Sequence, residues 1–266
     1  MQIMGILNVT PDSFSDGGEH LDPDAAVAWA EQMLSEGADI VDVGGESTRP
    51  GAAPVDAQAE MHRVLPVVEA LAQRCVVSID TMKADVARAA VAAGAQIIND
   101  VSASMAHVAA ELGVGWIAMH MQGAPRTMQT NPSYTDVVAE VRNFLGERAE
   151  AARALGVPRV WIDPGIGFGK RYVDNLDLLR RLDVFVDTGI PVVLGASRKS
   201  FLGTLLGQPV VNQRVVGSAM VAVYGEAAGV DIIRVHDVRA TRDALLVARA
   251  LNAPVGTPGP AAVNRA

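Results

Sequence analysis

The chain has 266 residues and is half hydrophobic, which is enough to form one large core or two small ones. Its formal net charge of −8 at pH 7 argues against a general nucleic-acid binder, so an anionic ligand would need a local basic cluster. Cys75 is the only cysteine, which excludes an intrachain disulfide and favours a reducing, cytoplasmic location. No apolar run reaches the roughly 18 residues of a membrane span, and the first residues lack the pattern of a signal peptide.

Short β-rich runs alternate with alanine-rich helical stretches along the chain. The predicted strands are Ile3–Leu7, Ile40–Val43, Val76–Ile79, Gln96–Asn99, Trp116–Met119, Arg159–Ile162, Pro191–Leu194 and Asp231–Val235. The predicted helices are Pro23–Ser35, Asp56–Gln73, Lys83–Ala93, Ser104–Leu112, Tyr134–Leu155, Asn175–Leu182, Arg214–Ala228 and Val238–Leu251. Apolar strands joined by helical crossovers predict a parallel sheet covered on both faces. Eight such units in about 250 residues favour a closed (β/α)₈ TIM barrel, with an open doubly wound sheet as the alternative.

The chain is expected to form one domain. We place the barrel over residues 1–251 and predict a disordered tail over residues 252–266, which are rich in Pro, Gly and Ala. Three junctions, Glu36-Gly-Ala-Asp, Ala93-Gly-Ala-Gln and Ala228-Gly-Val-Asp, are typical of a glycine that ends a helix before the next strand.

The first strand leads into a long polar loop. This loop begins with Asn8, contains the glycine pair Gly17 and Gly18, and continues until a helix is able to start at Pro23. Most βα turns are only a few residues long, whereas enzymes of this class present catalytic groups on loops at strand ends. An ordinary turn is the alternative interpretation.

Polar residues recur where the predicted strands end. In chain order these ends are Gly44–Ala52, Asp80 with Thr81, Asn99 with Asp100, His120, Asp163–Lys170, Gly195–Ser200 and Arg234–Asp237. In a barrel all strand ends of this kind meet on one face, where active sites lie. The sequence therefore predicts a single site built from seven or eight strand ends.

Eight strings occur in a fixed order: NVTPDSFSDGG, DVGGESTRPGA, SIDT, IIND, MHMQG, DPGIGFGK, GASRKSFLG and IIRVHDV. This ordered set, which runs from Met4 to about Leu251, resembles the dihydropteroate synthase family of the bacterial folate pathway. The resemblance implies a (β/α)₈ barrel that joins 6-hydroxymethyl-7,8-dihydropterin diphosphate to p-aminobenzoate and releases pyrophosphate. It also implies a homodimer and a target of sulfonamides.

Three residues are expected to bind the pterin. A carboxylate accepts two parallel hydrogen bonds from a guanidine-like edge, and the resemblance gives Asp80 this role; a helix N-cap is the alternative. Asp163 resembles the second carboxylate on the pterin, with a turn residue before Pro164 as the alternative. Asn99 resembles the amide beside it, with a strand-end backbone bond as the alternative. As pyrophosphate leaves, a fixed carboxylate would stabilise positive charge on the pterin.

Five basic or hydroxyl side chains and one aromatic ring complete the predicted site. By resemblance, Lys199 reaches the pterin, Ser197 and Arg198 border the p-aminobenzoate site, and Phe168 supplies an apolar wall. We expect Ser197–Lys199 to begin the helix after strand seven, with a solvated basic turn as the alternative. Arg234 and His236 lie two apart on strand eight and are expected to bind the diphosphate, with a salt-bridged arginine and a core histidine as the alternative.

Mg²⁺ is the expected cofactor, with Asn8 as a ligand, because this ion keeps several waters and uses substrate phosphate oxygens. Two long loops, Thr10–Gly18 and Glu46–Pro54, are expected to order over the site, the second bringing Thr48 and Arg49 to the substrates. Two other functions stay open: a methyltetrahydrofolate–corrinoid methyltransferase, which would need no pyrophosphate site, and a catalytically silent pterin-binding paralogue. The small-molecule substrates are the only partners expected beyond a second copy, with no nucleic acid and no membrane.

Overall fold

Eight parallel strands form a barrel in the computed structural model, which describes residues 1–10, 22–47 and 53–254. The strands are β1 (Gln2–Asn8), β2 (Ile40–Gly44), β3 (Val76–Asp80), β4 (Ile97–Asp100), β5 (Gly115–Met119), β6 (Val160–Asp163), β7 (Val193–Leu194) and β8 (Ile232–Val235). Their order in the sheet is β6-β5-β4-β3-β2-β1-β8-β7, and a bridge between Ile162 and Val192 joins the two edges. The predicted (β/α)₈ barrel is confirmed, and the open doubly wound sheet is excluded.

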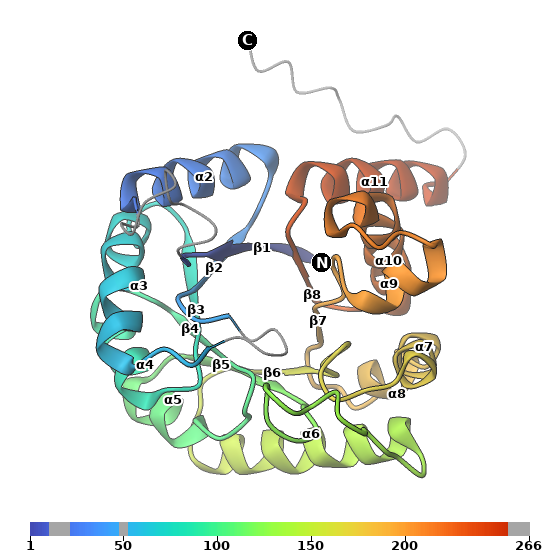
Figure 1. Ribbon diagram of the computed structural model, residues 1–266, viewed down its shortest axis with the longest axis horizontal. Coiled ribbons are helices and arrows are strands. Elements are labelled where there is room, and N and C mark those ends of the chain that lie inside the picture. The colour runs from blue at the N-terminus through green and yellow to red at the C-terminus, as the bar shows by residue number, and fades with distance from the viewer. Residues whose placement is uncertain (11–21, 48–52, 255–266) are drawn as a thin grey trace.

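Helices form the outer ring around these strands (Figure 1). They are α2 (Pro23–Glu36), α3 (Ala57–Leu71), α4 (Ala84–Ala92), α5 (Ala106–Leu112), α6 (Val137–Ala154), α7 (Tyr172–Arg180), α8 (Asp183–Val186), α9 (Ser200–Leu206), α10 (Val215–Ala228) and α11 (Val238–Asn252), with a 3₁₀ turn at Val211–Arg214. None of the helices that the structure describes combines the length and apolar character that a bilayer-spanning helix needs.

Most element boundaries agree with the prediction to within two residues, and the exceptions have local causes. Helix α6 begins at Val137 rather than Tyr134 because the Asp136 carboxylate accepts hydrogen bonds from the first backbone N–H groups of the helix. Helix α7 begins at Tyr172 rather than Asn175, where Asp174 accepts a hydrogen bond from the Arg171 backbone N–H. Helix α5 differs by only two residues and begins at Ala106, where Asp100 accepts hydrogen bonds from the N–H groups of Ser104 and Met105. Helices α8 and α9 are absent from the predicted helix ranges. The predicted glycine junctions are confirmed: Gly37, Gly94 and Gly229 all have left-handed φ angles.

The interior of the barrel changes character along its axis. Side chains in a strand alternate between the two faces, so every second residue points inward. At the amino ends of the strands the inward residues form an apolar closed-end cluster of Met4, Ile40, Val76, Ile97, Ile117, Trp161, Val193 and Ile232. Two residues further along each strand, the inward positions are Ile6, Asp42, Ser78, Asn99, Met119, Asp163, Gly195 and Arg234, which we call the polar layer. The strands therefore carry apolar packing to one end and charge to the other.

The main hydrophobic core lies between the strands and the ring of helices. The alternate residues of the strands, such as Val41, Val77 and Ile98, point outward into it and are fully buried. Burial on both faces explains why the strands are continuous apolar runs. Much of the predicted first loop, Thr48 and Arg49 of the second, and residues 255–266 of the predicted tail lie outside the described residues.

Candidate active site

The carboxyl ends of the strands bring most of the predicted site residues to one end of the barrel. Asn99, Asp163 and Arg234 lie in the polar layer, and Asp80 lies one inward position further along β3. In the sheet register, Asp80 lies beside Gly44 of β2 on one side and beside Asn99 of β4 on the other. The predicted convergence of strand ends is confirmed for these residues.

Arg234 is the central cation of this site. Its Nε donates to Asp42 Oδ2 at 2.6 Å, and its Nη2 donates to Asp80 Oδ2 at 2.6 Å. The side chain of Asp42 is fully buried, and that of Asp80 is 13 % exposed. The salt-bridged alternative for Arg234 thus describes its geometry here, with one carboxylate from β2 and one from β3. The two anions raise the pKa of Arg234 although burial opposes this, so the guanidinium stays charged.

Burial shifts the two predicted pterin-binding carboxylates in the same direction. It raises the pKa of Asp80 to about 7, against the lowering effect of Arg234, and nearby Asp42 and Glu60 add to the rise. It also raises the pKa of Asp163, although a hydrogen bond from the Gly165 N–H to Asp163 Oδ1 opposes it. Asp163 therefore holds the turn that follows its strand, as the alternative suggested. The helix-cap alternative for Asp80 is wrong, because Thr81 Oγ1 accepts the hydrogen bond from Lys83 N–H.

Asp42 is a member of the site that the sequence reasoning missed. It is buried on β2, and its Oδ2 accepts a hydrogen bond from Asn99 Nδ2 at 2.9 Å as well as that from Arg234. The strand-end backbone bond suggested as the alternative for Asn99 is thus replaced by a side-chain bond. The missed signal was a lone carboxylate inside the apolar strand IVDVG, two residues beyond the inward-facing Ile40.

The glycine-rich loop after β6 carries Phe168 toward Lys199. The ammonium nitrogen of Lys199 lies 3.9 Å from the centre of the Phe168 ring, a cation–π contact. Phe168 also belongs to an apolar cluster with Val101, Met119 and Met128. The predicted aromatic wall and the predicted lysine therefore lie next to each other at the mouth.

Lys170, at the end of the same loop, is a second residue that the sequence reasoning missed. Its Nζ is buried and lies 2.9 Å from His120 Nδ1, and it donates to the carbonyl oxygens of His120 and Phe168. Burial lowers the pKa of Lys170 to about 7 and that of His120 to about 3. The missed signal was a lysine after three closely spaced glycines, which places the amine inside rather than on the surface.

The ends of β7 and β8 are joined by two polar contacts. Ser197 Oγ accepts a hydrogen bond from His236 N–H and lies 3.1 Å from His236 Nδ1. Arg198 donates to both carboxylate oxygens of Asp237, through Nε at 2.9 Å and Nη2 at 2.5 Å. Arg198 has a left-handed backbone, with φ of 59°, and helix α9 begins only at Ser200, so the predicted helix start at Ser197–Lys199 is wrong. His236 lies one residue beyond β8 and reaches Ser197 at the end of β7.

A charged cluster lies at the base of the second predicted loop. Lys83 Nζ lies 2.5 Å from a carboxylate oxygen of Glu46 and 2.5 Å from one of Glu60, and Glu60 is fully buried. Burial alone would lower the pKa of Lys83, but the hydrogen bonds to the two glutamates outweigh it and raise the pKa. The other oxygen of Glu46 accepts from Val55 N–H at 3.0 Å, which ties together the two described ends of this loop. Thr48 and Arg49, between those ends, lie outside the described residues.

Asn8 ends β1 directly beside Gly44 of β2 and is half-buried. Its amide supplies one neutral oxygen, which is a hard donor of the kind that Mg²⁺ accepts. Within the described ranges, no group of three or more His, Cys, Asp or Glu side chains is arranged to bind a metal ion. Asn8 therefore fits a metal that draws its other ligands from elsewhere, such as water or a bound anion.

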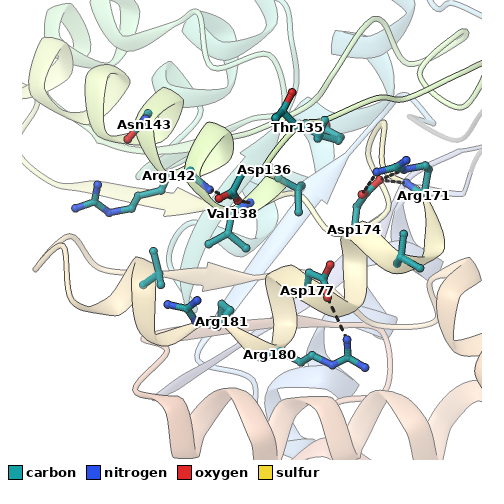
Figure 2. A pocket seen from close by; sticks show the side chains of 15 residues that line it. Thr135, Asp136, Val138, Arg142, Asn143, Arg171, Asp174, Asp177, Arg180 and Arg181 are labelled. Carbon is teal, nitrogen blue, oxygen red and sulfur yellow. Dashed lines mark hydrogen bonds and ion pairs between the residues drawn. The ribbon is translucent and has the colours of Figure 1, made fainter.

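A separate groove of about 800 Å³ lies on the outside of the barrel, between the start of α6 and the helices α7 and α8 (Figure 2). Its charged side chains are largely paired with one another: Arg171 with Asp174 and Arg180 with Asp177. No predicted site residue that the structure describes lines it. The barrel mouth, rather than this outer groove, is therefore the candidate active site.

Known proteins resemble this chain over most of its length. The family model described as "Pterin binding enzyme" matches residues 4–236. A dihydropteroate synthase of Haemophilus influenzae is 48% identical over 255 residues, covering 92% of this chain and 92% of that protein. A Xanthomonas albilineans dihydropteroate synthase structure with 4-aminobenzoic acid is 48% identical, with a TM-score of 0.89 and coverage of 95% and 93%. Another from the same organism, in complex with 7,8-dihydropteroate, is 45% identical, with a TM-score of 0.85 and coverage of 95% and 94%.

Proposed function

The chain belongs to the dihydropteroate synthases of the pterin-binding enzyme family, and we propose from this premise how its own residues carry out the reaction. The reaction joins 6-hydroxymethyl-7,8-dihydropterin diphosphate to p-aminobenzoate. The bond between the pterin methylene carbon and the diphosphate oxygen breaks, the amine nitrogen bonds to that carbon, and pyrophosphate and one proton are released. The observation that carries the assignment of residues is the set of carboxylates around Arg234 at the barrel mouth.

The polar layer binds the pterin in this proposal. Asp80 and Asp163 accept hydrogen bonds from the N–H groups of the heterocycle, and Asn99 both donates and accepts beside them. Gly195 faces the same space: a Cβ added there would lie 3.4 Å from Asp163 Oδ2. A position without a side chain leaves room for a flat ring against that carboxylate. As the carbon–oxygen bond breaks, the buried carboxylates stabilise the positive charge that develops on the pterin.

Arg234 and His236 hold the diphosphate end of the substrate, and Lys199 reaches the pterin and the groups beside it. Arg234 uses Nε and Nη2 for its two carboxylates, and among the described residues its Nη1 makes no hydrogen bond. That nitrogen is the donor we assign to a diphosphate oxygen. Its partner anions keep it charged, and the neighbouring Lys199 and His236 add further donors where the leaving group gains charge.

Mg²⁺ is proposed as the metal, with Asn8 as its one protein ligand. When bound beside Asn8, the ion supplies a Lewis acid for the leaving pyrophosphate. The role of Asn8 is to fix one coordination position with its amide oxygen at the end of β1. The remaining positions fit water and diphosphate oxygens, which makes metal binding depend on the substrate.

The p-aminobenzoate site is proposed along one side of the mouth. Phe168 forms its apolar wall, Ser197 and Arg198 border it, and Thr48 and Arg49 supply donors from the second loop. Because Arg198 is held by Asp237, its contribution to the amine substrate is to fix the backbone of the loop that also carries Lys199. Exclusion of water from this side would protect the cationic carbon from hydrolysis.

The test is incubation of the protein with the pterin diphosphate, labelled p-aminobenzoate and Mg²⁺, followed by chromatography for labelled dihydropteroate. We expect product and an equal amount of pyrophosphate, with neither formed when the pterin diphosphate is omitted. Binding of the pterin without any product would favour the catalytically silent paralogue. Methyl transfer from methyltetrahydrofolate to a corrinoid would favour the other alternative.

A homodimer is proposed, with the outer faces of α10 and α11 as the contact. On α10 the exposed apolar residues Val216, Met220 and Tyr224 are spaced four apart, so they share one face of the helix. On α11 Val247 and Leu251 repeat that spacing. An exposed apolar face of this kind is typical of an interface between subunits.

Light scattering with size-exclusion chromatography tests the dimer. We expect the wild type to have twice the chain mass and Met220→Glu to have the mass of one chain. The matched control is Val173→Glu, which changes a similarly exposed apolar residue on α7 and leaves the dimer intact. A wild-type protein with the mass of one chain would contradict the proposal.

A cytoplasmic location is proposed from the single cysteine, and cell fractionation tests it.

A further inference from the structure

Asp42 is a buried carboxylate that none of the roles above explains. It lies on β2 in the polar layer, 1 % exposed, with one oxygen bonded to both Asn99 and Arg234. Its other oxygen, Oδ1, is buried and has no hydrogen-bond partner among the described residues. A buried acceptor without a partner destabilises a folded protein, so stability alone does not account for a carboxylate at this position.

We infer that Asp42 is a positioning residue, which sets the orientation of the Asn99 amide and the place of the Arg234 guanidinium before substrate binds. This inference rests on the proposed function of the barrel mouth. As the anionic partner of Arg234, Asp42 offers only acceptor atoms. Asn99 must therefore turn its NH₂ group toward Asp42, and its amide oxygen is directed away, toward whatever ligand occupies the site.

The same oxygen of Asp42 couples the two residues that it holds. Arg234 approaches from β8 and Asn99 from β4, two strands that are not neighbours in the sheet. A single acceptor on β2 thus fixes the distance between the residue assigned to the pterin edge and the residue assigned to the diphosphate. A substrate whose diphosphate is joined to the pterin ring through a single methylene group needs that separation to be set in advance.

Asp42→Asn is the decisive variant, because it keeps the shape of the side chain but removes the carboxylate that only accepts hydrogen bonds. The new amide is able to donate or accept, so Asn99 is no longer held in one orientation. We expect KM for the pterin diphosphate to rise about tenfold, the lower end of the effect of losing a partner that orients a binding residue. KM for p-aminobenzoate should stay unchanged. In the Asn99→Ala background the same substitution should raise KM for the pterin diphosphate by less than about threefold, because Asn99, one of the two residues through which it acts, is gone.

A pH profile gives a readout that a merely structural role would not change. The charged groups that act on Asp80 are Arg234, Asp42, Glu60 and Lys199. Because Asp42 raises the pKa of Asp80, its neutralisation should shift the acidic limb of kcat/KM, which we expect near pH 7 in the wild type, to lower pH. The control is Asp39→Asn, three residues earlier, where the carboxylate binds Ile3 N–H at the closed end of the barrel. It should shift neither KM nor the acidic limb.

Nuclear magnetic resonance tests the inference on the wild-type protein without substrate. The side-chain NH₂ resonance of Asn99 should exchange slowly with solvent, and exchange should quicken in Asp42→Asn if that variant folds. Rapid exchange in the wild type, or unchanged KM and an unchanged acidic limb in a folded Asp42→Asn, would overturn the positioning role. If the wild type makes no dihydropteroate, the proposed function fails, while the exchange measurement still decides whether Asp42 orients Asn99.

Discussion

The two ends of the barrel interior use the same eight strands and the same alternation of side chains, yet they are filled by opposite chemistry. At the closed end the inward residues form an apolar cluster that includes Met4, Ile117 and Trp161. Two residues further along, the polar layer holds Asp42, Asn99, Asp163 and Arg234, nearly all of them buried. Buried ion pairs seldom add net stability, whereas buried apolar side chains add about 1.5–3 kcal/mol each. The closed end therefore stabilises a fold whose other end is arranged for binding.

The largest expected effect on stability is at the closed end. Trp161 is buried in the closed-end cluster and packs against Gly115, where an added Cβ would lie 2.7 Å from the indole ring. Trp161→Ala should lower the free energy of unfolding by about 3–5 kcal/mol through lost contacts and a cavity. Urea denaturation followed by circular dichroism measures this.

The matched control for that variant is Trp161→Phe. It retains most of the ring and removes an indole N–H that has no hydrogen-bond partner among the described residues, so it should cost much less. Turnover per folded molecule should be close to wild type in both variants. A change at Trp161 that lowers kcat/KM while leaving stability intact would contradict the assignment of stability to one end and binding to the other.

The next largest effect is on the reaction, at the open end of the barrel, where Asp80 ends β3. Asp80→Asn preserves size but removes the negative charge and one acceptor, so transition-state stabilisation should fall by roughly 2–4 kcal/mol. Steady-state kinetics and pterin binding by calorimetry measure it. The control is Asp231→Asn, whose carboxylate binds Val192 N–H at the closed end and should affect stability rather than turnover. Full activity in Asp80→Asn would remove this residue from the mechanism.

The effect at Lys170 depends on pH and is smaller over any one pH unit. The charged or titratable groups that face it are Asp163, Lys199, Asp174 and His120. Burial lowers the pKa of Lys170 from 10.5 to about 7, so between these values the unfolded chain binds a proton that the folded chain does not. Stability contributed by this group should therefore rise with pH across that window, by up to about 1.4 kcal/mol per pH unit.

Lys170→Met should remove that pH-dependent component, leave the backbone carbonyls of His120 and Phe168 without their donor, and leave His120 Nδ1 without its partner. Urea denaturation at several pH values between 7 and 10 compares the slopes. Lys170→Arg is the companion variant, because a guanidinium stays charged across the window and should also lose the slope. Equal slopes in the wild type and both variants would show that Lys170 does not titrate in the folded state.

The sequence predicted the fold well because the fold depends on a repeated pattern. Apolar strands, glycine-ended helices and the count of units each indicated the barrel, and errors at helix starts came from acidic side chains such as Asp100 and Asp136. The polar residues at the carboxyl ends of the strands, including Asp80 and Asp163, were predictable because they follow apolar runs. These features are local, so one sequence is enough to show them.

The pairing inside the mouth was not predictable in the same way. Asp42 contacts Arg234, which is 192 residues away, and Asn99, which is 57 residues away. Such contacts depend on how far each strand is shifted against its neighbours, and residue types do not fix that shift. Lys170 was missed for a related reason. Its three hydrogen-bond partners are a histidine ring and two backbone carbonyls, and no sequence pattern predicts contacts of this kind. Thr48 and Arg49 stay predictions.

The smallest expected effect is at Cys75, which directly precedes β3 and so lies at the closed end of the strand that carries Asp80 at its other end. Burial raises the pKa of its thiol, which makes it a poor nucleophile. Among the described residues its Sγ has one hydrogen-bond contact, a long one of 3.8 Å to the Leu71 carbonyl oxygen. Cys75→Ala should lower the free energy of unfolding by about 1 kcal/mol or less and leave kcat and both KM values unchanged. Treatment of the native enzyme with iodoacetamide should likewise leave turnover intact, with mass spectrometry to report how much of the thiol has reacted. Loss of turnover in Cys75→Ala without loss of structure would place chemistry at the closed end and contradict the separation of the two ends.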